Sequence, residues 1–223
     1  MRARRASVGL VSSSLSLIGR RVLSKNTHMT RIGLISDVHA QLDALESALD
    51  VLTRRGVDRV LCAGDLVDKG PDGDAVIELV QRRLIPCVRG NHDESAARHH
   101  QLTPWPSESD RELSEDSVDY LLELPLTRSY LIDGQRLLLA HGIPTSNRIY
   151  FFPDRGKPKE LKRWARNPQH DYVVLGHTHR PMDVDWLGAR YLNPGSVSKT
   201  RPRDSHTCAI LTLPSGEFEV IEL

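Results

Sequence analysis

The first half of the chain alternates short apolar runs with longer amphipathic segments, and this alternation is its most constraining feature. Residues 31–36 (RIGLIS), 59–63 (RVLCA) and 85–88 (IPCV) are short and apolar, which is typical of strands buried on both faces. Between them, apolar residues recur at helical spacing in 41–55 and in 73–83. Strand–helix–strand–helix–strand with short connections predicts a parallel sheet covered by crossover helices.

The second half of the chain is expected to be mainly β. Residues 129–132 and 136–140 flank Asp133-Gly134, a strong hairpin signal. The other predicted strands are 172–175 and two hairpins, 182–186 with 190–192 and 207–213 with 217–221. The polar, proline-interrupted residues 99–117 predict an excursion, followed by a helix near 117–124. One domain with two sheets fits this pattern.

The charge distribution does not indicate a specific nucleic-acid or membrane partner. The 223 residues include 30 basic and 29 acidic side chains, a net charge of +1. Six of the basic residues lie in 1–28, which contains no acid, so the remainder has 24 basic against 29 acidic residues, a net charge near −5. A chain with this balance offers no basic stripe to follow a phosphate backbone, which also disfavours a nuclease.

Residues 1–28 are expected to form an extension outside a single domain at 29–223. The apolar run 8–18 contains four serines and is far too short for a bilayer core of about 30 Å. An Arg-rich, Ser-rich, acid-free leader is compatible with an organellar transit peptide. The alternative is that Met29 is the true start. We expect residues 1–28 to be either disordered or not translated.

The cysteines indicate a reducing compartment. Cys62, Cys87 and Cys208 are odd in number and lack C-x-x-C spacing, which argues against a disulfide framework and a zinc ribbon. We expect three reduced, buried thiols and a cytoplasmic protein. The sequence does not indicate an oligomeric state.

Five polar clusters follow directly after apolar runs. They are Asp37-Val38-His39, Gly64-Asp65, Gly90-Asn91-His92-Asp93, His141-Gly142 and Gly176-His177-Thr178-His179. Each alone has an ordinary explanation, such as a surface turn or a hydrogen-bonded structural histidine. Together, at the carboxyl ends of strands, they are expected to meet at one rim of the sheet, where such folds bind ligands. Carboxylate, imidazole and amide donors suit Mn²⁺, Fe or Zn²⁺ better than Ca²⁺.

In that order, the five blocks resemble the calcineurin-like metallophosphoesterase superfamily, whose pattern is D-x-H, G-D, G-N-H-D/E, H and G-H-x-H. Residues 193–197 (NPGSV) are similar to its small bacterial phosphodiesterase branch. The resemblance extends from about residue 31 to the end of the chain, apart from 99–117. It implies an α/β (α+β) fold: a four-layer αββα sandwich of two mixed β-sheets flanked by helices.

The resemblance also implies a dinuclear site. It assigns Asp37, His39 and His179 to one divalent metal ion, Asn91, His141 and His177 to the second, and Asp65 to both. Mn is expected ahead of Fe, Ni and Zn. The implied reaction is hydrolysis of a phosphodiester or phosphomonoester bond in a small phosphate ester by a metal-bridging hydroxide.

The same resemblance assigns catalytic roles to His92 and Asp93. His92 has the position of the residue that stabilises or protonates the leaving group, and Asp93 would orient its ring. Asn91 would contact substrate as well as metal.

Lys69 and four aromatic residues have more than one interpretation. The segment GDLVDKG is similar to the GDxVDRG of protein serine/threonine phosphatases, where Arg holds phosphate. Lys69 could supply charge without a bidentate fork, or be a solvated loop lysine. The aromatic residues could line a leaving-group pocket or pack locally; they are Trp105, Tyr150, Phe151 and Phe152.

Two alternative functions therefore stay open. One is a protein or dinucleoside-polyphosphate phosphatase, which the VDKG segment favours. The other is a non-catalytic metal-binding scaffold of the same fold, against which His92 counts, because a scaffold needs no leaving-group acid.

Overall fold

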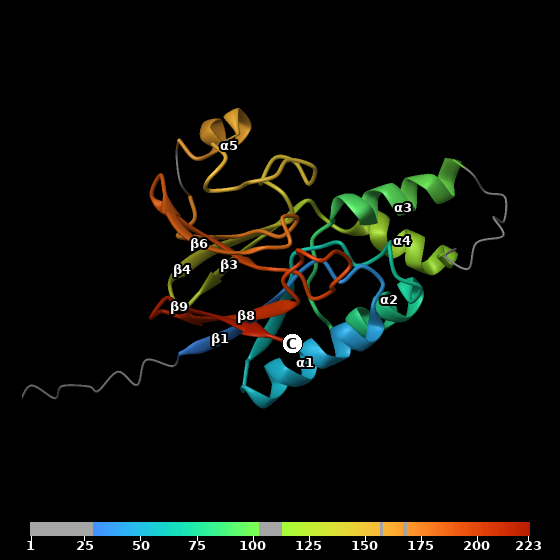
Figure 1. Cartoon of the computed structure of the whole chain (residues 1–223). Helices are drawn as coiled ribbons and strands as arrows, with labels where there is room; N and C mark the ends of the chain where they lie inside the picture. Colours follow the sequence, from blue (N-terminus) through green and yellow to red (C-terminus); the bar gives the residue numbers. More distant parts are fainter. Residues whose placement is uncertain (1–28, 103–112, 157, 167–168) are drawn as a thin grey trace, which may run out of the picture.

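Two mixed β-sheets form the centre of the molecule (Figure 1). The structure, a computed structural model, describes residues 29–102, 113–156, 158–166 and 169–223. The first sheet has the strand order β2–β1–β8–β9 and the second β3–β4–β5–β7–β6. The strands of the first are β1 (Thr30–Ile35), β2 (Arg59–Cys62), β8 (Thr207–Leu213) and β9 (Glu217–Glu222). Those of the second are β3 (Thr127–Ile132), β4 (Gln135–Ala140), β5 (Tyr172–Val174), β6 (Pro181–Trp186) and β7 (Ala189–Pro194).

The two sheets pack face to face through buried aliphatic side chains. Leu34 and Leu211 of the first sheet belong to the same core cluster as Leu137, Leu139 and Leu192 of the second. The alternating residues Leu138 and Ala140 of β4 lie in a different cluster, because successive side chains of a strand point to opposite faces. Both faces of each sheet are therefore covered.

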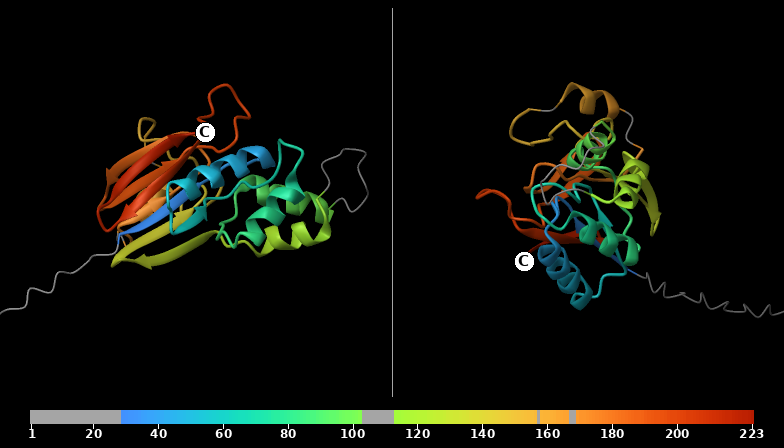
Figure 2. Two further views of the ribbon diagram at one scale, coloured as in Figure 1. Left: turned by 90° about the horizontal axis from the view of Figure 1, so that it is seen from below. Right: turned by 90° about the vertical axis from the view of Figure 1, so that its right-hand side faces the viewer.

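Helices provide the outer layers. Helices α1 (Leu42–Arg54) and α2 (Gly73–Arg82) pack on the first sheet, and α4 (Glu115–Glu123) joins the same cluster. On the second sheet the layer is thinner and consists of α5 (Lys159–Trp164) with the segment before it. The right-hand view of Figure 2 shows α5 (gold) and α1 (blue) on opposite sides of the sheets. The expected αββα sandwich is confirmed.

The three predicted hairpins are confirmed, with strand bounds that differ from the prediction by at most two residues. Ile132 pairs with Gln135 around Asp133 and Gly134, which both have positive φ (48° and 78°), as a two-residue hairpin turn requires. The two later hairpins pair β6 with β7 and β8 with β9.

The prediction of a third strand at 85–88 is wrong. Only an isolated bridge joins Cys87 to Cys62 there. Pro86 has no amide hydrogen to donate, and the preceding Leu84 has a φ of 52°, so the segment lies beside β2 without continuing the ladder.

Helices α3 (Asn91–Leu102) and α5 were not predicted, and α3 runs alongside α4 (Figure 1). The last residues of α3, 99–102, lie within the predicted excursion at 99–117. Residues 1–28, Trp105 and most of the rest of that excursion lie outside the described residues.

Two further findings concern the whole described chain. Cys62, Cys87 and Cys208 are free and buried, as predicted. Among the described residues, no helix combines the length and the hydropathy needed to span a membrane.

Candidate metal centre

The predicted ligands come from four loops and the start of one helix. Asp37 and His39 follow β1, Asp65 follows β2, His141 follows β4, and His177 and His179 follow β5, while Asn91 is the first residue of α3. Strands β1 and β2 belong to one sheet and β4 and β5 to the other. The carboxyl ends of parallel strands in both sheets therefore meet at a common rim.

Five of these ligands have a backbone conformation that non-glycine residues rarely adopt. Their φ angles are 56° for Asp37, 52° for His39, 56° for Asp65, 65° for His177 and 56° for His179. Such left-handed residues cost of order 1–3 kcal/mol each and persist where surrounding contacts enforce them. Their concentration in the ligand loops marks these loops as functional.

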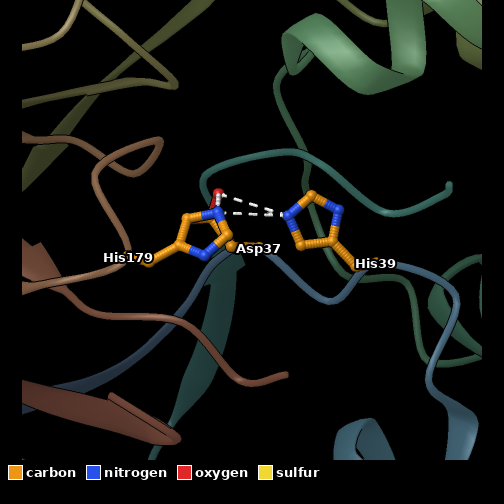
Figure 3. Close-up of side chains that lie close together, drawn as sticks. All are labelled: Asp37, His39 and His179. Carbon is orange, nitrogen blue, oxygen red and sulfur yellow. Dashed lines mark hydrogen bonds and ion pairs between the residues drawn. The ribbon is translucent and has the colours of Figure 1, made fainter. Parts of the chain in front are cut away.

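The first group of ligands consists of Asp37, His39 and His179 (Figure 3). His179 Nε2 lies 3.2 Å from Asp37 Oδ1, and His39 Nε2 lies 3.2 Å from His179 Nε2 and 4.0 Å from Asp37 Oδ1. One carboxylate oxygen and two imidazole nitrogens, all potential metal ligands, thus lie within 4.8 Å of one another.

The second group consists of Asp65, His141 and His177. His141 Nε2 lies 3.2 Å from Asp65 Oδ2 and 3.1 Å from His177 Nδ1. Asn91 Oδ1 lies 3.1 Å from the same His141 nitrogen and adds an amide oxygen to the group.

Asp65 connects the two groups. Its Oδ2 is 3.2 Å from His141 Nε2 in the second group and 3.9 Å from His39 Nε2 in the first. Its other oxygen accepts a hydrogen bond from the His92 amide at 2.9 Å. One carboxylate oxygen therefore faces both groups while the other is held by the backbone.

These residues fit metal ions, because the arrangement leaves buried potential ligand atoms without hydrogen-bond partners. Asp37 Oδ1 and Asp65 Oδ2 are buried and accept no hydrogen bond within the described chain. A buried carboxylate oxygen that accepts no hydrogen bond is costly. The Nε2 atoms of His39 and His179 also face each other at 3.2 Å beside the Asp37 carboxylate. A divalent cation in each group would satisfy both features, and the mixed oxygen–nitrogen set suits a transition metal.

The site electrostatics favour neutral imidazole at two ligands. Burial lowers the pKa of His39 to about 4, and burial with the nearby charge of His141 lowers the pKa of His177 to about 4. Burial also opposes charging of His141, but the adjacent Asp65 carboxylate outweighs it and raises the pKa to about 9. Neutral nitrogen is the form that binds metal.

The ligand histidines are oriented by partners outside the cluster. His141 Nδ1 lies 2.7 Å from the Ala63 carbonyl oxygen, and His179 Nδ1 lies 2.9 Å from Asp204 Oδ1. Such contacts fix the tautomer and leave the opposite nitrogen free for a cation. No sequence pattern indicated Asp204, which lies outside the five polar clusters.

The segment at 193–198 holds the Asp37 loop in place. The hydroxyls of Ser196 and Ser198 donate to the Asp37 carbonyl oxygen at 2.9 and 2.8 Å, and the Val197 amide donates to the Ser36 carbonyl oxygen at 2.9 Å. The sequence similarity at NPGSV therefore has a structural reason.

Two motif glycines are required by close approach. A Cβ atom at Gly90 would overlap Asp65 Oδ1, and one at Gly176 would overlap the Ser36 hydroxyl. Both glycines let neighbouring loops approach the ligands closely.

His92 lies beside the centre, but its partner is not the predicted one. Its ring is perpendicular to that of His39 with centroids 4.9 Å apart, and its Nδ1 lies 2.6 Å from Asp68 Oδ2. The prediction that Asp93 orients this ring is wrong. The Asp93 carboxylate is fully buried and accepts hydrogen bonds from the amides of Gly90 and Asp65 at 2.8 and 2.9 Å.

Asp93 also accepts from Leu66 N at 2.7 Å. It therefore anchors the loop after β2 to the start of α3, and Asp68 is the residue that orients His92. Asp68 lies next to Lys69 in the VDKG segment, but the sequence analysis did not single it out.

Lys69 reaches the centre. Its Nζ lies 2.7 Å from His39 Nε2, and burial lowers its pKa. The interpretation as a solvated loop lysine is therefore not supported.

The aromatic residues have different roles. Phe151 is buried in the core over the second sheet, so local packing explains it. Tyr150 stacks on His177 with ring centroids 3.7 Å apart, and Phe152 lies stacked next to Tyr150 at 5.7 Å.

Comparison with known proteins gives consistent results. The family model of the calcineurin-like phosphoesterase superfamily domain matches residues 30–216. Phosphodiesterase YfcE of Escherichia coli is 29% identical over 208 residues, which cover 87% of this chain and 93% of that protein. Serine/threonine-protein phosphatase 2 of Escherichia coli is 30% identical over 199 residues, or 78% of this chain and 91% of that protein.

A solved structure supports the same assignment. The metallophosphoesterase from Sphaerobacter thermophilus is 28% identical with a TM-score of 0.64, covering 86% of this chain and 88% of that one. With the family model, the two sheets and the clustered ligands in agreement, this chain belongs to the calcineurin-like phosphoesterase superfamily and is a hydrolase of phosphoric esters.

Proposed function

We propose that this chain is a dinuclear metal-dependent phosphoesterase that hydrolyses phosphodiester or phosphomonoester bonds in small substrates. Asp37, His39 and His179 hold one cation and Asn91, His141 and His177 the other. Asp65 serves both.

The observation that carries this proposal is the position of Asp65 Oδ2. This buried oxygen accepts no hydrogen bond and faces one histidine of each ligand group, at 3.2 and 3.9 Å. A site for a single cation would not need one carboxylate directed at two groups of donors.

When bound, two cations would offset phosphate charge and lower the pKa of water at the site. The residues of the chain supply the remaining steps. Lys69 and Asn91 hold the phosphate, since the ammonium and the amide both reach the ligand cluster. His92 donates a proton to the leaving oxygen, and the Asp68 carboxylate stabilises the charged ring that must carry this proton.

Mn is the proposed metal, with Fe, Ni and Zn as alternatives, because carboxylate, amide and imidazole donors are all compatible with these ions. The test is hydrolysis of nitrophenyl phosphate monoester and bis(nitrophenyl) phosphate by metal-stripped protein with each metal restored separately. Turnover restored by Mn supports the proposal. Equal turnover of the stripped protein with and without metal would refute it.

A protein phosphatase is the second candidate, and Lys69 favours it. This residue occupies the place of the phosphate-binding Arg in the similar GDxVDRG segment, and it reaches the ligand cluster. A phosphoserine peptide hydrolysed faster than both nitrophenyl esters would favour this candidate.

The scaffold alternative has a direct test too. His92 and its Asp68 partner have no evident use in a protein that only binds metal. Two bound metal ions without hydrolysis of any ester would favour the scaffold. The three buried free thiols support a cytoplasmic location, which imaging of the tagged full chain would test.

A further inference from the structure

A cleft of about 470 Å³ opens beside the ligands His177 and His179. Three segments contribute to its wall: the one between β4 and α5, the loop after β5, and the loop between β7 and β8. Its volume is in the range of sites that hold small organic ligands.

Four arginines line this cleft: Arg155, Arg180, Arg201 and Arg203. The ion-paired arginines of the described chain are all others, namely Arg55, Arg82, Arg98, Arg136, Arg148 and Arg190. The acidic residue of the lining, Asp204, is already engaged with His179 and with the hydroxyl of Thr200 at 2.8 Å. The cleft therefore concentrates positive charge in a domain whose net charge is near −5. Such a site is built for an anion.

Aromatic rings form the other part of the lining. Tyr150 lies nearly parallel to His177, with 14° between the ring planes, yet 49% of its surface is exposed. Phe152 is stacked beside it, and the guanidinium groups of Arg155 and Arg180 lie 4.7 and 5.8 Å from the Phe152 ring centre. A planar group stacks well on rings and guanidinium planes that are held in this way.

We propose that this cleft binds the leaving group of the substrate, and that this group carries a second phosphate and a planar ring, as in a nucleoside diphosphate. The inference rests on the proposed function, because the cleft adjoins His177 and His179, one residue from each proposed ligand group. A small nucleotide is favoured over a polynucleotide, because the domain outside this cleft has a net negative charge.

The test is binding of α,β-methylene adenosine diphosphate to the metal-loaded full chain by calorimetry. We expect it to bind at least about tenfold more tightly than methylenediphosphonate, which has the same two phosphorus groups and no ring. Arg155→Gln, which is remote from the ligands in sequence, should weaken nucleotide binding about tenfold. Arg83→Gln at the exposed end of α2 is the matched control and should leave binding unchanged.

Tyr150 provides an independent variant. Tyr150→Leu should reduce the preference for the nucleotide over methylenediphosphonate, whereas Tyr150→Phe, which keeps the ring, should retain it. Because Tyr150 touches the ligand His177, metal content is measured for both Tyr150 variants. If Tyr150→Leu loses metal, the inference is decided by the result for Arg155→Gln.

Equal affinity for the two probes, or nucleotide binding insensitive to Arg155→Gln, would overturn the inference. Tighter Arg155-dependent binding of a short single-stranded oligonucleotide would also overturn it. Turnover of bis(nitrophenyl) phosphate by the same preparation separates the two proposals. Turnover without nucleotide preference overturns only the inference, and nucleotide binding without any turnover overturns the proposed function together with the leaving-group role.

Discussion

At the scale of single residues, the charge on Asp65 governs the site. Burial disfavours its carboxylate, yet the contacts with His141 and His39 hold its pKa well below its usual range. The residue therefore stays negative between two groups that would each hold a cation. An amide of the same shape would lack the charge that offsets the repulsion between those cations.

Asp65→Asn is accordingly expected to bind fewer than two metal ions per chain. The loss of metal affinity should exceed the roughly 10- to 100-fold typical of residues that only support a ligand. Elemental analysis and turnover measure this, with Asp50→Asn on the exposed face of α1 as the control. Two tightly bound ions and a near-normal rate in Asp65→Asn would contradict the bridging role.

His92→Ala is expected to retain both metal ions and to lower the rate roughly 10²–10⁴-fold, the usual contribution of a general acid. The deficit should be small for nitrophenolate, which needs little protonation, and large for alkoxide leaving groups. Rate measured against leaving-group pKa for the parent and the variant decides this. Parallel slopes would show that His92 binds phosphate by charge instead.

The residues that cluster in the candidate metal centre could be predicted from the sequence because they lie in short motifs, most of them directly after strands. Asp68 and Asp204 could not be predicted in the same way. Asp68 meets His92, 24 residues away, at a turn in which Asp68 and Lys69 have φ angles of 71° and 74°. No local pattern encodes that turn.

At the scale of the elements, the start of α3 and the loop after β2 act as one unit. Asp93 at the beginning of α3 accepts hydrogen bonds from four amides, at Gly90 and, in that loop, at Asp65, Leu66 and Val67. The position of the Asp65 carboxylate thus depends on a helix that is separate from the strand that precedes it.

Asp93→Ala is therefore expected to destabilise the fold by about 3 kcal/mol, because buried amides lose their acceptor. Asp68→Asn, at a partly exposed carboxylate, should change the free energy of unfolding little and instead reduce the rate for alkoxide leaving groups. Denaturant unfolding and leaving-group kinetics measure the two effects. A kinetic defect in Asp93→Ala with unchanged stability would restore Asp93 as the residue that orients His92.

Elements with strong periodicity could be predicted, and those without it could not. Helix α1 has apolar residues at helical spacing, and the Asp133-Gly134 turn defines the hairpin of β3 and β4. Helix α3, in contrast, begins with the polar run NHDES and has no apolar stripe from which a helix could be inferred. Its start is stabilised by contacts with the β2 loop, which only the tertiary structure shows.

At the scale of the whole molecule, the core formed by the described residues lies after Met29. All three buried clusters begin at Ile32 or later, and the ligands begin at Asp37. A chain that starts at Met29 should therefore fold, bind metal and turn over substrate as the full chain does. Thermal unfolding, metal content and rate test this, and loss of folding or of metal would contradict it.

The central claim is that two cations act at one site linked by Asp65. The most direct measurement is the rate of bis(nitrophenyl) phosphate hydrolysis as Mn is titrated into metal-stripped protein, with bound metal determined in the same samples. The account predicts that the rate reaches its plateau at two bound ions per chain. A plateau at one bound ion, or two bound ions without hydrolysis, would contradict it.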